Sequence, residues 1–275
     1  MQLFSSWTGS DFLLFYGLLL AFACGAAWWI PANLREPGRR GDSSDPESVA
    51  LLAGGPARFT DSLLADLYVR GGLTALDGGK LAAVQQGLSA SPAGKALLDQ
   101  SGPITLAEAR KLMAVHAERV AARLRRSGLL LRPEEFARLR WLSITPFAAL
   151  LVLGLYRQRA GSAVGEPTGF LVMLLGLTVA LAVIRFIKGD PRTMAGIATV
   201  KQLRAQNARL AQAPRPEEAA MAVALFGTGV LVGTPWEPVH AMCQQASDSG
   251  GSGGGDSSSD SGGGDGGGGC GGCGG

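Results

Sequence analysis

Groups that commonly carry out catalysis are scarce in this chain. Among 275 residues there are two histidines, and Asp, Glu, Lys and Arg together make up 17%. His116 and His240 lie far apart in the sequence, and no two acidic residues share a predicted helix face. General acid–base catalysis needs such groups close together. The sequence therefore predicts a protein that is not an enzyme. The net charge of +3 is small, so the placement of the charges is more informative than their sum.

Cysteine is also rare, with four residues in the whole chain. Cys24 lies in an apolar stretch, Cys243 stands alone, and Cys270 and Cys273 lie close to the C-terminal end. Small secreted domains that depend on disulfide bonds carry many more cysteines at regular spacings. The four cysteines therefore do not form a disulfide framework.

Basic residues are absent from residues 1–11, where Asp11 is instead acidic. A cleaved signal peptide begins with a positively charged segment, which is missing here. The run from Ala21 to Cys24 has only a faint likeness to a lipoprotein cleavage box, because Ala21 stands where leucine is usual. We therefore expect the first apolar stretch to be retained as a membrane anchor.

Three uncharged apolar stretches are the strongest signal in the sequence, at residues 12–30, 141–156 and 168–184. A bilayer core about 30 Å thick requires about 20 apolar residues in a helix. These stretches predict an N-terminal transmembrane anchor over residues 1–31 and further transmembrane helices over 141–160 and 168–187. Arg185 is the one charge expected inside the membrane, which argues against a transporter.

The arginines predict the orientation in the membrane. Arg35, Arg39 and Arg40 directly follow the first span, whereas no basic residue precedes it. Because Lys and Arg collect on the cytoplasmic side, we expect the N-terminus outside and residues 32–140 inside. The third span then returns the chain, with its C-terminal tail, to the cytoplasm of a bacterial inner-membrane protein.

Residues 42–140 predict a small soluble domain of helices and a hairpin. Asp45 and Pro46 form a helix start, and glycines at 54–55 and 71–72 end successive helices. The sequence of residues 77–80 is a strong hairpin-turn signal. Helix, turn, helix and hairpin suggest a winged-helix-like module.

Nucleic-acid binding is disfavoured for this module. The helix over residues 56–70 carries Arg58 and Arg70 but also Asp61 and Asp66. Neutralisation of phosphates supplies much of the affinity for DNA, and this helix brings no net positive charge to it. We expect a role in packing or protein contact instead.

A helix with a basic stripe and another that leads into the second span complete this region. Thr105 and Glu108 predict a capping box, and Arg119, Arg123 and Arg126 lie on one side of the helix that follows. The stripe has two open interpretations, contact with anionic lipid or a solvated helix face. A further helix begins near residue 133.

After the third span the sequence predicts a polar helix over residues 192–212 and an apolar segment over 219–233. The apolar segment is short, so an interfacial helix is favoured over a fourth span. Residues 248–275 contain only Gly, Ser, Asp and Cys, which predicts a disordered tail with a Cys-Gly-Gly-Cys motif near its end.

Four residues of the C-terminal region form a candidate metal site. His240 with Cys243, and Cys270 with Cys273, are pairs separated by two residues, and one His with three Cys suits tetrahedral zinc. Closing the long Gly/Ser-rich run between the pairs costs entropy, and no folded segment would supply a second shell. We therefore favour a flexible tether without a cofactor. Zinc binding or thiol chemistry at these residues is the alternative.

Several short motifs resemble an uncharacterised bacterial family, the TIGR04222 domain-containing membrane proteins. The similar segments are residues 45–46, 51–58, 69–73 and 222–227, followed by the Gly/Cys-rich end. The resemblance implies a membrane protein with a low-complexity tail, and it supplies no catalytic residues. This chain departs from the family pattern because its tail holds only two cysteines, which weakens any role for a cysteine cluster.

The sequence thus predicts a mainly α membrane protein with three transmembrane helices, a small helical, winged-helix-like soluble domain and a disordered tail. Its expected role is that of a non-enzymatic scaffold or protein-contact module. The expected partners are the lipid bilayer and another protein, and nucleic acid is disfavoured.

Overall fold

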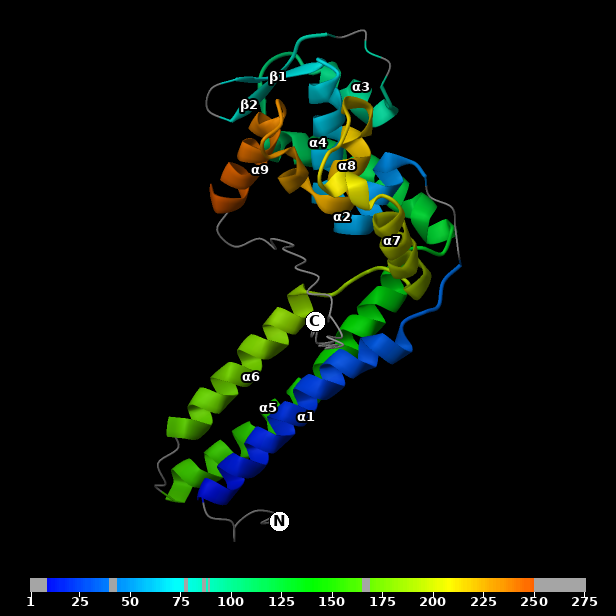
Figure 1. Ribbon diagram of the computed structural model, residues 1–275. Coiled ribbons are helices and arrows are strands. Elements are labelled where there is room, and N and C mark those ends of the chain that lie inside the picture. The colour runs from blue at the N-terminus through cyan, green and yellow to red at the C-terminus, as the bar shows by residue number, and fades with distance from the viewer. Residues whose placement is uncertain are drawn as a thin grey trace, which may run out of the picture.

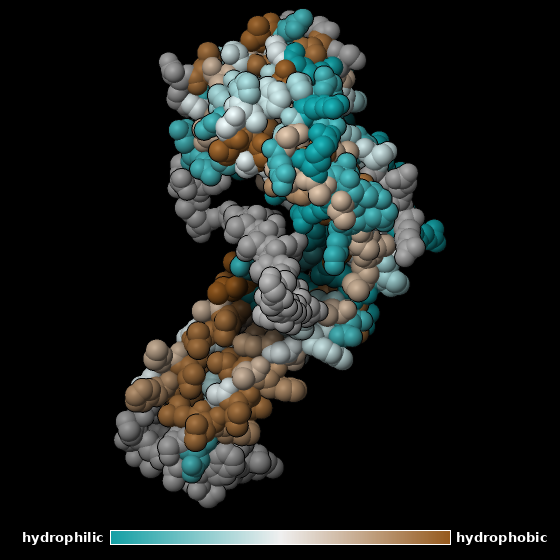
Figure 2. Space-filling model, viewed as in Figure 1, coloured by the Kyte–Doolittle hydropathy of each residue, from teal (hydrophilic) through white to brown (hydrophobic). Residues whose placement is uncertain are grey.

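The computed structural model describes residues 9–39, 44–76, 79–85, 88, 90–164 and 169–249. A bundle of long helices extends from one end of a domain of shorter elements (Figure 1). The bundle consists of α1 (Gly9–Leu34), α5 (Pro133–Val164) and α6 (Gly169–Ile187). Figure 2 shows hydrophobic surface over the bundle and a largely hydrophilic surface over the domain. This is the mainly helical architecture that the sequence predicts.

The long helices agree with the predicted spans. Within the described residues, three helices are long and apolar enough to cross a membrane. They include residues 11–34, 133–159 and 169–187. The middle helix begins before the predicted 141–160, because the helix that starts at Pro133 runs without a break into the apolar stretch. The backbone hydrogen bonds of a helix are satisfied internally, which a chain in lipid requires.

In the bundle, α1 and α6 both pack mainly against α5. Tyr16 and Thr178 are fully buried, and their hydroxyl oxygens are 3.1 Å apart. Thr178 Oγ1 donates to the carbonyl oxygen of Leu174, so Tyr16 donates to Thr178. Gly154 allows this close packing, since a Cβ there would lie 2.7 Å from Leu175 Cδ2 and 3.1 Å from Tyr16 Cε2. Small residues at such contacts let membrane helices approach one another closely.

The first half of the domain contains α2 (Pro46–Val69), β1 (Leu73–Leu76), β2 (Lys80–Ala83), α3 (Pro92–Leu98), β3 (Ile104–Thr105) and α4 (Leu106–Arg126). The described strands pair antiparallel in the order β1-β2-β3. Gly54 and Gly55 break the helical backbone of α2, with φ of +71° at Gly55, at the predicted boundary between two helices. The predicted capping box of α4 also forms.

The second half of the domain follows the bundle in the sequence. It contains α7 (Met194–Gln206), the 3₁₀ turns η1 (Ala208–Ala211), η2 (Pro216–Glu218) and η3 (Thr228–Leu231), α8 (Ala219–Phe226) and α9 (Glu237–Ser249). The predicted polar helix over 192–212 corresponds to α7 and η1. Of the predicted tail, residues 248–249 belong to α9, and residues 250–275 lie outside the described residues.

The structure corrects the expectation that residues 219–233 lie at the membrane interface or span the membrane. Ala222, Val223, Ala224 and Leu225 have no exposed surface, and α8 packs chiefly against α2. A helix that is apolar on every side needs cover on every side, and the interior of a domain provides it as well as lipid does. Residues 219–226 are apolar because they form α8, a helix buried inside the domain.

The expected independent domain over residues 42–140 is therefore incomplete. Val223, Leu231, Val239 and Met242 belong to the same buried cluster as residues of α2 and α4. β3 also joins the predicted hairpin only after α3, so the domain is larger than a winged-helix-like module. The α5–α6 hairpin is inserted between the two halves that build this core.

Candidate functional site

The connections between the bundle and the domain meet in one junction. The connection after α1 reaches α7 through two backbone hydrogen bonds: Met194 N–H donates to Glu36 O at 3.0 Å, and Ala195 N–H donates to Pro37 O at 2.9 Å. The connection before α5 is joined through Leu131 N–H, which donates to Pro191 O at 2.9 Å. Backbone hydrogen bonds thus tie all three connections together.

Thr193 lies at the centre of this junction. Its hydroxyl donates to Gly128 O at 2.9 Å and lies 3.0 Å from Leu129 O, and the same oxygen caps α7 by accepting from Gly196 N–H. The side chain is 2% exposed. Gly38 has φ of +68° and packs directly against Gly128 and Thr193, where a Cβ would clash. Gly38 is difficult to replace because its positive φ and its close contacts both disfavour a side chain.

Asp190 binds two arginines at this junction. Asp190 Oδ2 accepts from Arg35 Nη1 at 3.3 Å, and both carboxylate oxygens accept from Arg192 Nε at 3.0 and 3.1 Å. Burial raises the pKa of Asp190, but the hydrogen bonds and charge of Arg192 and the charge of Arg35 outweigh burial and hold this pKa below its usual value. The carboxylate is therefore ionised at neutral pH and connects the end of α1 to the start of α7.

Further cations surround the junction at the domain end of the bundle. Arg185 Nε donates to Ala27 O at 3.1 Å, which links α6 to α1. The Arg140 guanidinium on α5 stacks 3.4 Å from the centroid of the Phe186 ring. The exposed Lys188 follows one turn after Arg185. This end of the bundle thus carries several cations beside the carboxylate of Asp190.

A second polar cluster lies inside the domain. Asp61 of α2 accepts from Arg110 Nη2 of α4 at 3.3 Å, and the Asp61 side chain is 13% exposed. Burial raises the pKa of Asp61, and the charge and hydrogen bond of Arg110 only partly oppose the increase. The Cys243 thiol of α9 is hydrogen-bonded to Asp61. Burial first, then the negative charge of Asp61, raise the pKa of this thiol far above its usual value.

Arg58 connects this cluster to α8. A Cβ at Gly227, which has φ of +90°, would lie 3.3 Å from Arg58 Cζ, and the charge of Arg58 also acts on Asp61. Residues 51–58 of α2 and residues 222–227, at the end of α8, therefore meet at this contact and pack in the core of the domain.

The structure describes two of the four predicted metal ligands, His240 and Cys243. His240 and Cys243 lie one turn apart on α9, but His240 Nδ1 is 3.0 Å from Thr228 Oγ1 and Cys243 is buried beside Asp61. Cys270 and Cys273 lie outside the described residues. Within the described part of the chain, no three His, Cys, Asp or Glu side chains form a group able to hold a metal ion. A cysteine binds zinc as the thiolate, and the raised pKa of Cys243 opposes formation of this thiolate.

The predicted basic stripe on α4 is exposed. Arg119, Arg123 and Arg126 all lie on the surface, so either solvent or anionic lipid can reach them. The sequence analysis assigns no role to Asp190, which is the one acidic residue in the basic segment 185–192. A lone carboxylate among cations, directly after an apolar span, is the sequence signal that indicates this junction.

Comparison of the chain with protein-family models, with curated proteins and with solved structures gave no match. Family membership therefore stays a prediction from the short motifs. What the protein does must be inferred from the junction and the domain themselves.

Proposed function

We propose that this protein is a non-enzymatic membrane scaffold, which holds a helical domain in a fixed orientation at the bilayer surface for contact with another protein. The observation that carries the proposal is the junction, where all three connections are hydrogen-bonded to one another. A domain on a free tether would need a single connection and no such contacts. Rigid presentation lowers the entropic cost of binding a partner.

The buried polar residues of the domain have a structural role in this proposal. Asp61 and Arg110 face each other across α2 and α4, and the Cys243 thiol is protonated and enclosed. A nucleophilic cysteine needs a lowered pKa and access to a substrate. These residues are better suited to fixing the helices than to chemistry.

We further propose that the protein belongs to the bacterial family that its motifs resemble, in the inner membrane with the N-terminus outside. Basic residues gather where the first and third spans meet the domain, which favours a cytoplasmic domain. They are Arg35, Arg39, Arg185, Lys188 and Arg192. Single cysteines introduced by Ser101→Cys and Ser162→Cys into a cysteine-free chain test this. A membrane-impermeant maleimide should label intact cells at position 162 and only lysed cells at position 101. The reverse pattern contradicts the orientation.

The contact role is tested by photo-crosslinking in living cells. Exposed apolar side chains of the domain gain most from a protein contact, and Val84 and Val115 are 64% and 59% exposed. A photoreactive residue at each of these sites should yield discrete protein adducts. Val152, which is 69% exposed on α5, serves as the matched control that faces lipid. Adducts no more abundant in the domain than at position 152 would overturn the proposal.

A further inference from the structure

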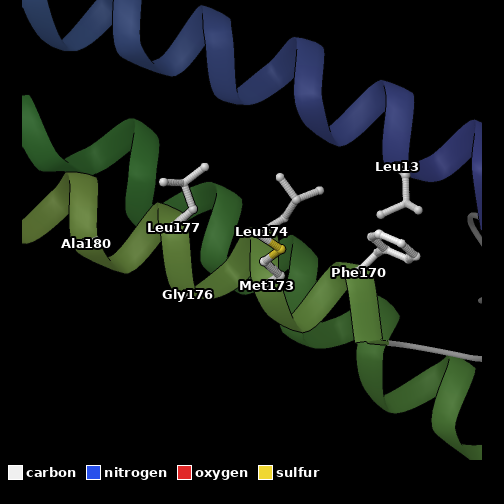
Figure 3. A pocket seen from close by; sticks show the side chains of 7 residues that line it. All are labelled: Leu13, Phe170, Met173, Leu174, Gly176, Leu177 and Ala180. Carbon is white, nitrogen blue, oxygen red and sulfur yellow. The ribbon is translucent and has the colours of Figure 1, made fainter.

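An open apolar groove runs between α1 and α6 on the surface of the bundle (Figure 3). Its volume is about 610 Å³, which is within the range of about 300–1,000 Å³ for small-molecule sites. In Figure 3, Leu13 of α1 and Phe170 of α6 face each other, and Leu174 and Leu177 point from α6 toward α1. The lining residues are Leu13, Phe170, Met173, Leu174, Gly176, Leu177 and Ala180.

The groove exists because α1 and α6 pack mainly on α5 and only lightly on each other. Their mutual contacts include the buried pair of Tyr16 and Thr178 and the hydrogen bond from Arg185 to Ala27. Beside these contacts, two of the α6 side chains that line the groove are largely uncovered by protein, because Phe170 is 74% exposed and Met173 is 75% exposed.

Two cations continue the groove toward the domain. Arg185 lies eleven residues after Leu174, and Lys188 lies eleven residues after Leu177. Eleven residues are close to three turns of an α-helix, so each cation is on the same side of α6 as its leucine and about 16 Å further along. That distance is about half of a hydrocarbon core roughly 30 Å thick, the length of a lipid chain in one leaflet.

These cations have hydrogen-bonding capacity to spare. Among the described residues, Arg185 uses Nε for Ala27 O and has no acceptor for its terminal nitrogens, and the exposed Lys188 has no acidic partner. The neighbouring Arg35 has a buried Nε without an acceptor. The carboxylate of Asp190 is already held by Arg35 and Arg192, and Glu36 is exposed to solvent.

We propose that the groove and these cations form a binding site for one anionic phospholipid. Its acyl chain lies along α6 from Leu177 toward Met173, and its phosphate accepts hydrogen bonds from Arg185 and Lys188. The positive charge of Arg185 and Lys188 favours the phosphate at the end of the groove nearer the domain. At the opposite end, Arg157 already lies 5.6 Å from the centroid of the Phe12 ring, and Asp11 would repel a phosphate.

Native mass spectrometry of the full chain in a non-ionic detergent tests the headgroup contacts. Phosphatidylglycerol and phosphatidylcholine with identical chains are added separately, and we expect one molecule of the anionic lipid to be retained preferentially. Arg185→Gln with Lys188→Gln should weaken phosphatidylglycerol binding at least tenfold, because each cation near a phosphate contributes to affinity. The double variant Arg157→Gln with Arg159→Gln is the matched control. It removes two cations at the end of the bundle away from the domain and should leave phosphatidylglycerol binding unchanged.

A second pair of variants tests the groove. A Cβ at Gly176 would meet no atom within 4 Å, so we expect the side chain of Gly176→Phe to enter the groove without a clash at its Cβ. Gly25 is equally open, but it lies on α1 outside the groove lining, so Gly25→Phe is the matched control. We expect phosphatidylglycerol binding to fall at least tenfold in Gly176→Phe and to be unchanged in Gly25→Phe.

Three results would overturn the proposal: equal retention of both lipids, unchanged binding after removal of the two cations, or unchanged binding in Gly176→Phe. Inorganic phosphate is added as a competitor, and displacement of the lipid at millimolar concentration would reveal a plain phosphate site instead. Circular dichroism verifies that each variant is folded. If the double variant unfolds, Lys188→Gln alone, at an exposed residue, replaces it with an expected loss of severalfold.

Discussion

Arg35 and Asp190, separated by more than 150 positions in the sequence, form an ion pair of 3.3 Å at the boundary between the bundle and the domain. The Arg35 side chain is 11% exposed, so the pair is largely shielded from water. Because Asp190 also binds Arg192, one carboxylate joins the end of the first span to the start of the second half of the domain.

We expect Asp190→Asn to destabilise the protein by about 2 kcal/mol, because Arg35 and Arg192 lose their shared charge while still partly buried. Thermal unfolding in detergent measures the change. Asp66→Asn is the control, since Asp66 pairs with the more exposed Arg70 on one helix face and should cost less than about 0.5 kcal/mol.

The lowered pKa of Asp190 gives this contribution a pH dependence. The stabilisation is fully present above the unfolded value near 3.8 and is lost as the pH falls through the lower value of the folded protein. Wild type and Asp190→Asn should therefore differ most at neutral pH and converge in strong acid. A constant difference at every pH would contradict the assignment of the effect to this charge.

Asp61 and Arg110 should show strong coupling. Arg110→Met leaves a buried carboxylate without its main cation, and Asp61→Leu leaves a cation without its carboxylate, so each change should cost about 3 kcal/mol. The double variant should cost less than either single change. Additive losses, measured by chemical denaturation, would show that the pair does not interact energetically.

The raised pKa of Asp61 predicts a pH dependence of the stability of these variants. Its folded pKa is above the unfolded value, so ionisation opposes folding, and stability rises as the pH falls through the raised folded value toward the unfolded value. Without Arg110 the pKa rises further, and the gain on lowering the pH from 7 to 5 should be larger in Arg110→Met than in wild type.

The two halves of the domain should fold together without the membrane hairpin. Leu130 and Arg192 form an antiparallel bridge, so residues 44–132 and 190–249 can be joined by an Asn-Gly turn. We expect this fusion to be soluble and to unfold cooperatively. Residues 45–140 alone should lack a fixed core, because α8 and α9 are missing. Near-ultraviolet circular dichroism and thermal unfolding compare the two chains.

Cys243 should be unreactive in the folded protein. A chain with Cys24→Ala, Cys270→Ser and Cys273→Ser retains this thiol alone, and its reaction with a disulfide reagent at pH 8 should require denaturant. Burial and the raised pKa both suppress the thiolate. Elemental analysis of the wild-type chain should accordingly find no stoichiometric zinc. One zinc per chain that is lost in Cys243→Ser would establish the metal site instead.

Local signals predicted most of the secondary structure. Glycines at 54–55, the Thr105–Glu108 capping box and the hairpin strands all appear where the sequence placed them. Each depends on a few neighbouring residues, such as a backbone angle open to glycine or a side chain that caps a helix end. The same holds for the spans, since an apolar run of sufficient length suffices to predict them.

The role of α8 could not be predicted in this way. An apolar helix of eight residues has the same composition whether lipid or protein covers it, and only the position of α2 distinguishes the two. The candidate sites were missed for a similar reason. Asp190 with Arg35, and Asp61 with Arg110 and Cys243, are brought together by segments far apart in the sequence.

The sequence by itself determined that this chain has three apolar spans, where α2 and α4 begin, and where its hairpin lies, because these properties depend on local composition and backbone preference. The tertiary structure alone decided that residues on both sides of the membrane hairpin build one core. It also decided that the three connections meet at Thr193 and Asp190. Such contacts lower the free energy of the folded state only when segments far apart in the sequence come together, and a local sequence pattern does not predict this.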